Sequence, residues 1–357
     1  MDIILLGAGR IGKAISKYLD NQYNLTIVDF SEKNLNEVKS WGEIKKYEIK
    51  NRKNISNLIK NYDLIIGCLP GKLGFDTMKA CIMEEKNLID LSFMPENCLK
   101  LNDEAKSKNI TIIPDAGFAP GLSNIFAGRL YKKFDKINEI GIRVGGLPIK
   151  KFPPLYYKIT WSPNDLISEY TRKARLIKDN NTVEIDPLEI IHKVKIKNYK
   201  FEEFYSDGLR TLLHNLDIKN LWETTLRWEG HLSKIKVLRE LNFFKENNLE
   251  NTLNIISPLM DYDSRDFSIM EIKGTGKINN KNREIKYYLY DEQKDGLTSM
   301  ARVTGFTAGV ITEIFIKYQD DFTKGVVAPE IIGQNKKIHD EIIKKLKEND
   351  IHIEYIL

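Results

Sequence analysis

The fold is decided by the segment Ile3-Ile4-Leu5-Leu6-Gly7-Ala8-Gly9-Arg10-Ile11-Gly12, near the start of the 357-residue chain. Its first four residues form a continuous apolar run, which is typical of a strand buried on both faces of a sheet. Three glycines follow with the spacing G-x-G-x-x-G, and residues 10–19 have the periodicity of a helix. A buried strand, a glycine turn and a helix in this order predict the first unit of a doubly wound α/β fold.

Beyond this unit, short apolar runs alternate with helical patterns as far as residue 114. The expected strands are residues 24–28, 45–49, 64–68, 87–91 and 110–114, and the expected helices are residues 32–41, 55–61, 74–83 and 99–108. Strands with apolar residues throughout, separated by helices, predict a parallel sheet with helices on both faces.

After about residue 140 the pattern changes. Runs rich in β-branched and aromatic residues (156–161, 193–196 and 284–290) are interrupted by helical patterns at 163–172 and 232–244. This texture predicts a second, mixed α+β domain with largely antiparallel strands. Helices are expected at 300–317 and 337–348, followed by a strand at 352–355 that returns to the first domain. We therefore expect a discontinuous Rossmann domain, residues 1–125 plus about 296–357, and a second domain of about residues 126–295.

The glycine segment has the residues that a dinucleotide site requires. Gly7 allows a tight turn, Gly9 lets the backbone approach a pyrophosphate, and Gly12 lets helix and sheet pack closely. The helix N-terminus, Arg10 and Ile11 included, presents N–H groups to the phosphates. The next strand ends in Asp29, 20 positions after Gly9. A carboxylate there binds both ribose hydroxyls and repels a 2′-phosphate, which favours NAD as the cofactor, although Lys33 lies nearby.

Three later strands end in loops rich in small residues. They are Gly67-Cys68-Leu69-Pro70-Gly71, Asp90-Leu91-Ser92-Phe93-Met94-Pro95-Glu96, and Pro114-Asp115-Ala116-Gly117-Phe118-Ala119-Pro120-Gly121. Ligands of doubly wound sheets bind beyond the carboxyl ends of the strands. The candidate cofactor contacts in these loops are Cys68, Leu69, Pro70, Ser92 and Gly117.

Composition excludes several classes of protein. The net charge of +5 is spread along the chain with no aromatic-laced basic block, which argues against nucleic-acid binding. The three cysteines form no C-x-x-C pair and the five histidines have no ligand spacing, so we expect free thiols and no metal site. No apolar run reaches the length of a membrane span, and the N-terminal apolar run lacks a basic leader, so we expect a cytoplasmic protein.

Longer segments resemble the saccharopine dehydrogenase family, and most closely its lysine 6-dehydrogenase branch. They read LPGKLGF (69–75), DLSFMPEN (90–97), PDAGFAPGLSN (114–124), VGGLP (144–148), YYKITWSPNDLISEYTRKAR (156–175), SDGLRTL (206–212), TLRWEGHLSKIKVLRELNFF (225–244) and MARVTGF (300–306). The resemblance implies a nucleotide domain built from both chain ends, a central substrate and dimerisation domain, a homodimer, and oxidoreduction of a small amino-acid substrate.

For a lysine 6-dehydrogenase the chemistry would be hydride removal from the carbon that bears an amine. The amine, with a pKa of about 10.4, must first lose a proton, and water must then be activated to release ammonia. Asp115 is the first candidate for this proton handling, because its apolar Pro/Gly/Phe surroundings can shift its pKa. Glu96 and His231 are the other candidates, although a helix cap for Asp115 and a scaffold role for His231 are the alternatives.

The substrate carboxylate calls for a cation, and the planar guanidinium of arginine suits it best. Arg227 leads the candidates, which also include Arg175 and Arg302; each could form a structural ion pair instead. Tyr157 and Trp161 could line the pocket. Two rival functions remain: a saccharopine-type or carboxynorspermidine-type dehydrogenase, which would need room for a second carboxylate, and a non-catalytic NAD-binding sensor.

Overall fold

The computed structural model describes residues Met1–Leu357, and the chain divides into two compact units. Unit 1 comprises Met1–Arg129 and Ala301–Asp350, and unit 2 comprises Leu130–Met300 and Ile351–Leu357. The two divisions at Arg129 and Met300 fall within helices α6 (Leu122–Lys133) and α11 (Ser299–Lys317). Each unit is therefore built from two separate stretches of sequence.

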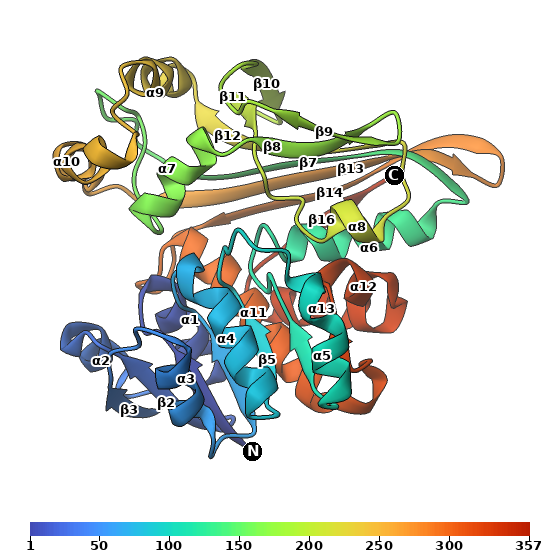
Figure 1. Cartoon of the computed structure of the whole chain (residues 1–357). Helices are drawn as coiled ribbons and strands as arrows, with labels where there is room; N and C mark the ends of the chain where they lie inside the picture. Colours follow the sequence, from blue (N-terminus) through green and yellow to red (C-terminus); the bar gives the residue numbers. More distant parts are fainter. The chain divides into compact units, whose positions relative to one another are not determined.

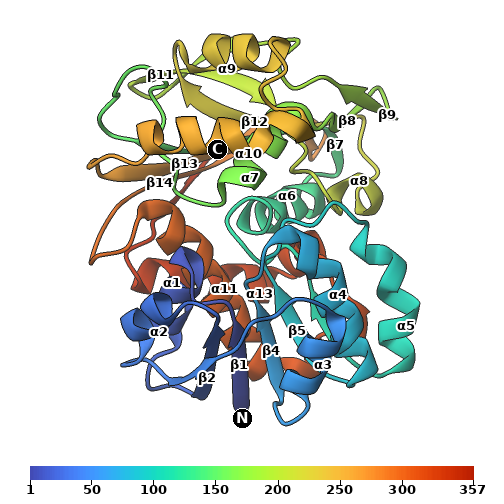
Figure 2. The same ribbon diagram turned by 60° about the vertical axis from the view of Figure 1, so that its left-hand side comes forward.

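Unit 1 contains a seven-stranded parallel sheet with the order β15-β6-β5-β4-β1-β2-β3. Its neighbouring strands β2, β1, β4 and β5 are labelled in Figure 2. Its strands are β1 (Asp2–Leu6), β2 (Asn24–Asp29), β3 (Glu43–Lys46), β4 (Leu64–Gly67), β5 (Asn87–Asp90), β6 (Thr111–Ile113) and β15 (Gly325–Val326). The strand order reverses at β1, with β2 on one side and β4 on the other. This confirms the predicted doubly wound α/β fold, and it puts the topological switch point at the glycine segment.

Helices cover both faces of this sheet. They are α1 (Arg10–Leu19), α2 (Glu32–Val38), α3 (Arg52–Ile59), α4 (Gly71–Met83), α5 (Asn102–Ser107), α12 (Pro329–Gln334) and α13 (Lys336–Glu348), with α6 and α11. Two short 3-10 turns, η1 (Cys98–Leu101) and η3 (Gln319–Asp321), also belong to this unit. On one face, α3, α4 and α5 bury Ile55, Met78 and Ala105 against strand residues such as Ile4 and Ile65. This continuous core explains why the central strands β1, β4 and β5 are largely apolar, whereas the edge strand β3 is exposed along its length.

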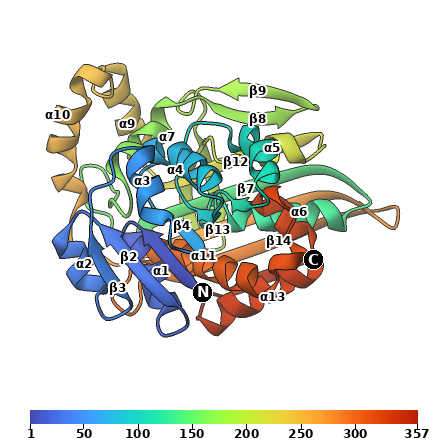
Figure 3. The same cartoon turned by 60° about the horizontal axis from the view of Figure 1, so that its bottom comes forward.

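Unit 2 contains a mixed nine-stranded sheet, in which seven strands lie side by side and two more branch off (Figure 1). The strands are β7 (Lys136–Pro148), β8 (Ala174–Lys178), β9 (Asn181–Ile185), β10 (His192–Ile196), β11 (Tyr199–Tyr205), β12 (Asn220–Trp228), β13 (Asp266–Ile278), β14 (Lys281–Glu292) and β16 (Ile353–Ile356). The path runs β10-β11-β12-β7-β13-β14-β16, and β8 with β9 forms a hairpin that joins at β12 (Figure 3). All pairs are antiparallel except β12 with β7, as the sequence predicted.

The helices of unit 2 enclose a separate core. They are α7 (Pro163–Thr171), α8 (Leu212–Asn215), α9 (His231–Glu240) and α10 (Glu246–Ile256), with the 3-10 turn η2 (Pro258–Met260). Leu166 and Tyr170 of α7 and Ile235 of α9 pack with Phe204 of β11 in one buried cluster. Thus α7 and α9 lie over the strands that carry the most polar buried residues of this unit.

Two expectations about unit 2 were wrong. The last strand, β16, pairs antiparallel with β14, from Leu289↔Ile353 to Lys286↔Ile356, and so does not join the sheet of unit 1. Residues 156–161 form no strand, because Tyr156 has a left-handed φ of 56° that ends any extended run there. The aromatic residues of this stretch serve as core instead, with Tyr157 and Ile159 in the same cluster as Tyr170.

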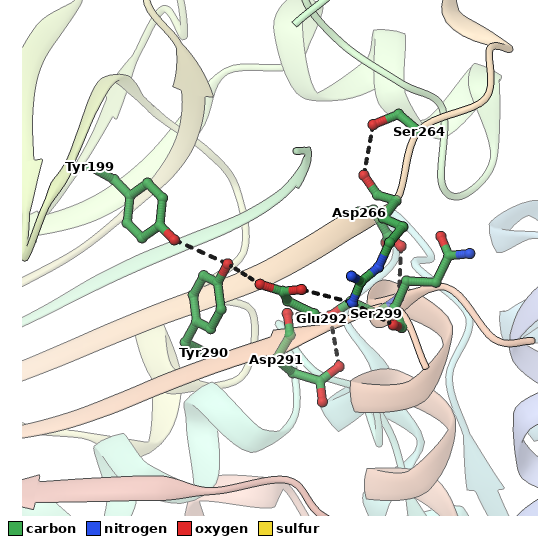
Figure 4. Close-up of polar contacts among 9 residues, drawn as sticks. Tyr199, Ser264, Asp266, Tyr290, Asp291, Glu292 and Ser299 are labelled. Carbon is green, nitrogen blue, oxygen red and sulfur yellow. Dashed lines mark hydrogen bonds and ion pairs between the residues drawn. The ribbon is translucent and has the colours of Figure 1, made fainter. Parts of the chain in front are cut away.

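The start of α11 is held by a side chain from a strand (Figure 4). Asp266 of β13 accepts hydrogen bonds from the N–H groups of Ser299 and Met300, at 2.9 and 3.2 Å. The Ser299 hydroxyl in turn donates to the Asp291 carboxylate at 2.8 Å. Burial raises the pKa of Asp266, and the two backbone donors oppose that rise. A carboxylate 33 residues away therefore caps the helix, and no local sequence signal marks it.

A second polar chain lies beside this cap in Figure 4. The Tyr199 hydroxyl donates to the Tyr290 hydroxyl at 3.1 Å, and Tyr290 donates to Glu292 at 2.9 Å. Glu292 also pairs with Arg265 at 2.8 Å. The rings of Tyr199 and Tyr290 stack at 5.7 Å between centroids, so the network stabilises the ends of β13 and β14 together.

Candidate active site

The glycine loop has the geometry that close approach of a ligand requires. Gly7 has a φ of +107°, and a Cβ atom there would lie 2.4 Å from the carbonyl oxygen of Cys68. A Cβ on Gly12 would lie 2.0 Å from the carbonyl oxygen of Gly7, so α1 packs directly on the turn. By contrast, a Cβ on Gly9 would meet no other atom within 4 Å. Gly7 and Gly12 are thus needed by the fold, whereas the space at Gly9 suits a phosphate group.

Arg10 and Ile11 begin α1, directly after Gly9, which is its N-cap. Arg10 is exposed and Ile11 is half-buried. No side chain caps this helix, and its first turn holds no acidic residue. The N–H groups at its start, together with the positive end of the helix dipole, therefore form an anion-binding site of the kind found in dinucleotide-binding proteins.

Asp29 lies at the carboxyl end of β2, beside this loop, and it is buried. One carboxylate oxygen accepts the Ala8 N–H at 2.8 Å, and the other accepts the Ser31 N–H at 2.7 Å. These bonds fix the orientation of the carboxylate, and a carboxylate has about four acceptor positions. The Asn34 side-chain amide also donates to the carboxylate, at 3.4 Å, so about one acceptor position remains for a ribose hydroxyl. The next residue, Phe30, is 69% exposed.

The loops after β4 and β5 are tied together by Asp90, which is fully buried. Its carboxylate accepts hydrogen bonds from the N–H and the hydroxyl of Ser92. A Cβ on Gly67 would collide with this same carboxylate. Of the predicted cofactor contacts after β4, Cys68 and Leu69 are half-buried and Pro70 is exposed. Burial raises the pKa of the Cys68 thiol to about 12, which leaves it protonated and unreactive.

The loop after β6 carries Asp115, which is buried and has a left-handed φ of 51°. The neighbouring Ala116 N–H donates to the Asp90 carbonyl oxygen at 2.9 Å. Gly117 follows, and a Cβ there would lie 3.2 Å from the Pro120 carbonyl oxygen and from Thr304. Gly7, Asp29, Ser92, Asp115 and Gly117 therefore lie at the same edge of the unit 1 sheet, at or beyond the ends of β1, β2, β5 and β6.

Unit 2 contains a buried arginine in a polar cluster. Arg227, at the end of β12, is 2% exposed. It donates to the Glu169 carboxylate and to the Tyr170 hydroxyl, both at 2.7 Å. Its guanidinium lies 4.7 Å from the centre of the Tyr157 ring, a cation–π distance. Arg227 is therefore already partly engaged by the protein.

His231 belongs to the same cluster, and its environment argues against an acid or base role. Its Nδ1 lies 2.7 Å from the Leu155 carbonyl oxygen, and its Nε2 lies 2.9 Å from the Tyr170 hydroxyl. Since a carbonyl only accepts, Nδ1 carries the proton and Nε2 accepts from Tyr170. Burial, together with the nearby charge of Arg227, lowers the pKa of His231 to about 3. His231 is thus a neutral bridge without a free nitrogen.

The other predicted site residues are dispersed. Glu96 is exposed. Arg175 forms a bidentate pair with Asp207, at 2.8 and 2.9 Å, so it is a structural ion pair. Arg302 is buried in unit 1, where it donates to the Asn349 carbonyl oxygen at 3.2 Å and lies over Phe306. Trp161 is half-buried and donates to the Tyr157 hydroxyl at 3.3 Å.

Sequence reasoning missed two polar residues in these clusters, the buried Asp90 and the half-buried Glu169. An acid at the end of an apolar strand, as Asp90 is at the end of β5, is a usable local signal. Glu169 lies on α7, two turns after the Ser162 cap, and nothing in the local sequence distinguishes it from a surface acid. No group of three or more His, Cys, Asp or Glu side chains is arranged to hold a metal ion.

Comparison with known families decides the affiliation. A model of the saccharopine dehydrogenase C-terminal domain matches residues 117–351. The chain belongs to the saccharopine dehydrogenase family. A second family model, the saccharopine dehydrogenase NADP binding domain, matches residues 3–113, which contain the glycine loop and Asp29. Unit 1 thus contains the pyridine-nucleotide-binding domain of this family.

Curated relatives are distant in sequence. The chain is 26% identical over 263 residues to the mitochondrial alpha-aminoadipic semialdehyde synthase of Bos taurus, covering 64% of this chain and 27% of that protein. It is 22% identical over 267 residues to a saccharopine dehydrogenase (NADP(+), L-glutamate-forming) of Schizosaccharomyces pombe, covering 70% of this chain and 59% of that protein. The matched part therefore spans only about a quarter of the animal relative and less than two thirds of the fungal one.

Solved structures show the same fold. The apo saccharopine dehydrogenase (L-Glu forming) from Saccharomyces cerevisiae has a TM-score of 0.81 at 17% identity, with all of both chains covered. The homospermidine synthase from Legionella pneumophila in complex with NAD has a TM-score of 0.70 at 14% identity, covering 99% of this chain and 91% of that one. Separately, none of the helices combines the length and the apolar character needed to cross a bilayer.

Proposed function

We propose that this protein is an NAD-dependent oxidoreductase that acts on a carbon–nitrogen bond of an amino acid, with L-lysine as substrate. Oxidation at the 6-amino group would give the 6-semialdehyde, which cyclises to piperideine-6-carboxylate, together with ammonia and NADH. The observation that carries this proposal is the Asp29 carboxylate, bonded to the Ala8 N–H at the end of β2. A homodimer in the cytoplasm is part of the same proposal.

The residues of unit 1 fit a nicotinamide dinucleotide. The open space at Gly9 and the uncapped start of α1 would accept the pyrophosphate, and Asp29 would accept hydrogen bonds from the adenosine ribose. The bound cofactor supplies the hydride acceptor. The matching family model is named for NADP; NAD is proposed because the Asp29 carboxylate would repel a 2′-phosphate.

Asp115 is the proposed proton acceptor. Its carboxylate is buried at the edge of the sheet where ligands of this fold bind. A substrate ammonium must become an amine before its carbon can be oxidised, and a carboxylate within hydrogen-bond reach can take that proton. The left-handed backbone at Asp115 is a strained conformation of the kind found at functional sites.

Arg227 is the proposed partner of the substrate carboxylate. Its charge is held by Glu169 and Tyr170 and by the faces of Tyr157 and Phe204, with the latter ring centre 5.6 Å away. These contacts fix the guanidinium plane, and a fixed plane favours carboxylate binding. We no longer propose this role for Arg175, because its guanidinium forms two hydrogen bonds with the Asp207 carboxylate.

The second candidate is a saccharopine dehydrogenase, the activity for which the fungal relative is named. Its substrate has an additional carboxylate, and so requires an additional cation. Carboxynorspermidine-type dehydrogenase activity and a non-catalytic NAD-binding role are weaker alternatives, the latter because Asp115 would have no use in a sensor.

The test is a spectrophotometric assay at 340 nm. The purified protein is mixed with NAD or NADP and, separately, with lysine, saccharopine, glutamate and alanine. NADH formation with lysine and NAD supports the proposal, whereas NADH formation with saccharopine alone replaces the substrate. No reduced cofactor with any amine would refute the enzyme assignment.

A further inference from the structure

The ion pair between the buried Arg227 and the half-buried Glu169 leaves hydrogen-bonding capacity unused. A guanidinium has five N–H donors. Arg227 uses three of them within the protein: Nη2 to the Glu169 Oε2 at 2.7 Å, Nε to the Tyr170 hydroxyl at 2.7 Å, and Nη1 to the Leu226 carbonyl oxygen at 3.0 Å. The remaining two N–H groups, one on each Nη, have no acceptor from the protein.

Other ion pairs of unit 2 differ in this respect. Arg175 binds both oxygens of Asp207, and Arg143 binds both oxygens of Glu203, at 2.7 and 3.3 Å. Such bidentate pairs satisfy both partners, as expected of ion pairs that only stabilise the fold. Arg227 and Glu169 share a single hydrogen bond although they are more deeply buried than Arg175.

Glu169 likewise has an unused hydrogen-bond acceptor. Its Oε2 accepts from Arg227, and no hydrogen bond is donated to its Oε1. The Glu169 side chain is 17% exposed, compared with 2% for Arg227, so the carboxylate is the accessible member of the pair. Burial raises the pKa of Glu169, and the charge of Arg227 counteracts this rise. An added positive group beside Oε1 would stabilise the ionised form.

We infer that Arg227 and Glu169 together bind the head group of a free α-amino acid, with Glu169 accepting the α-ammonium group. The inference deepens the proposed function, on which it rests. An α-amino acid carries a carboxylate and an ammonium on one carbon, so it offers acceptors to the unused N–H groups of Arg227 and donors to the unused oxygen of Glu169. The pair is complementary to both charges at once.

This arrangement defines a substrate class. It selects amino acids whose α-amine and α-carboxylate are both free, and it leaves a second, distant amine as the reacting group. A ligand that lacks the α-amine would leave Glu169 beside Arg227 without its second partner. Hydrogen bonds to charged groups contribute about 1.5–3 kcal/mol, which corresponds to about a 10- to 100-fold difference in affinity.

The test compares lysine with 6-aminohexanoate, which has the same chain and carboxylate but no α-amine. Equilibrium binding of each ligand to the whole protein is measured by calorimetry in the presence of NADH, so that turnover is not needed. The wild-type protein should bind lysine about 10- to 100-fold more tightly. Glu169→Gln should reduce lysine affinity by about that factor and change 6-aminohexanoate affinity by less than about threefold.

Two further variants complete the design. Glu184→Gln removes an exposed carboxylate that pairs with Lys173 at 3.6 Å in the same unit, and it should preserve the preference for lysine. Glu169→Asp keeps the negative charge and is used if Glu169→Gln unfolds or loses all binding. It should show part of the wild-type preference for lysine over 6-aminohexanoate. Circular dichroism and thermal unfolding of each variant verify that the fold is intact.

The outcomes separate the inference from the proposed function. Equal losses for both ligands in Glu169→Gln, or no loss for either, overturn the inference, as does a wild-type protein that binds both ligands equally or neither. A Glu169-dependent preference for lysine without NADH formation supports the inference and refutes the proposed activity. Lysine oxidation that is unaffected by Glu169→Gln supports the activity and overturns the inference.

Discussion

Ala8 donates its backbone N–H to the carboxylate of Asp29, at 2.8 Å. This bond joins the turn after β1 to the end of β2, and it orients the carboxylate at the edge of the sheet where the family's nucleotide-binding domain would bind its ligand. The bond shows that Asp29 supports the loop, and we propose that the same carboxylate contacts the cofactor. A test of its role must separate these two contributions.

We predict that Asp29→Asn shifts cofactor preference from NAD toward NADP by about 10- to 100-fold, because hydrogen bonds to charged groups contribute about 1.5–3 kcal/mol and the repulsion of a 2′-phosphate is removed. Asparagine keeps one acceptor oxygen for the Ala8 N–H but turns its NH2 group toward the Ser31 N–H, so thermal unfolding of the variant is measured alongside to verify that the loop is intact. The measurement is kcat/KM for both cofactors. Glu32→Gln, in an exposed pair with Lys46, is the control. An unchanged ratio would show that Asp29 does not contact the ribose.

Alanine substitutions at Gly9 and Gly12 should have opposite effects. Gly9 has a φ of −65°, which alanine tolerates, and its added Cβ meets no protein atom. Gly9→Ala should therefore keep stability within about 0.5 kcal/mol but weaken dinucleotide binding. Gly12→Ala should lose about 1–3 kcal/mol, because its Cβ would lie 2.0 Å from the Gly7 carbonyl oxygen. Urea unfolding and cofactor titration measure both effects; equal stability of the two variants would contradict this prediction.

Asp115→Asn should reduce kcat by about 100-fold or more, as expected for loss of a general base. Asparagine tolerates the left-handed conformation at this position, so the loop should persist. The KM for NAD should change by less than about threefold, since the change affects proton transfer rather than cofactor binding. Glu104→Gln, at an exposed residue of α5, serves as the control. Near-normal turnover of Asp115→Asn would remove this residue from the mechanism.

His231 should make stability depend on pH. Its pKa is about 3 in the folded protein and about 6.5 when unfolded. The unfolded state therefore binds the proton more tightly, and the contribution of His231 is fully present above about pH 6.5 and lost as pH falls toward 3. Between pH 7 and pH 5 the loss should be about 2 kcal/mol.

This contribution is isolated by comparison with variants. The free energy of unfolding of the wild type is measured at pH 7 and pH 5 alongside His231→Gln and His352→Gln, the latter an exposed histidine. His231→Gln should be less stable at pH 7, and its loss between the two pH values should be smaller by about 2 kcal/mol. If the pH dependence of His231→Gln matches that of the wild type, the buried neutral histidine is not its source.

The fold of unit 1 was predictable because its signals are local. Apolar strands, the glycine spacing and the acid at position 29 all lie within short windows, and they gave the parallel sheet. The exception is β15, Gly325–Val326, because a strand of two residues is too short to show a hydrophobic pattern in the sequence. Its pairing with β6 depends on residues far apart in sequence.

Unit 2 was less predictable because partners there are distant in sequence. The Arg175–Asp207 pair joins β8 to the loop after β11, 32 residues away, and the Arg227–Glu169 pair spans 58 residues. From the sequence alone, each of these arginines could equally form an ion pair or bind a ligand, because its partner lies far away in the sequence. The aromatic run at 156–161 has strand propensity, but burial of Tyr157 against Tyr170 and His231 overrides it.

The position of β16 has a practical consequence for handling the protein. This strand covers β14 from Lys286 to Leu289, so proteolytic trimming after Asp350 would leave a row of unpaired backbone groups along that strand. Uncovered strands of this kind promote aggregation by pairing with other chains. Loss of Ile351–Leu357 during purification should therefore be detectable as precipitation.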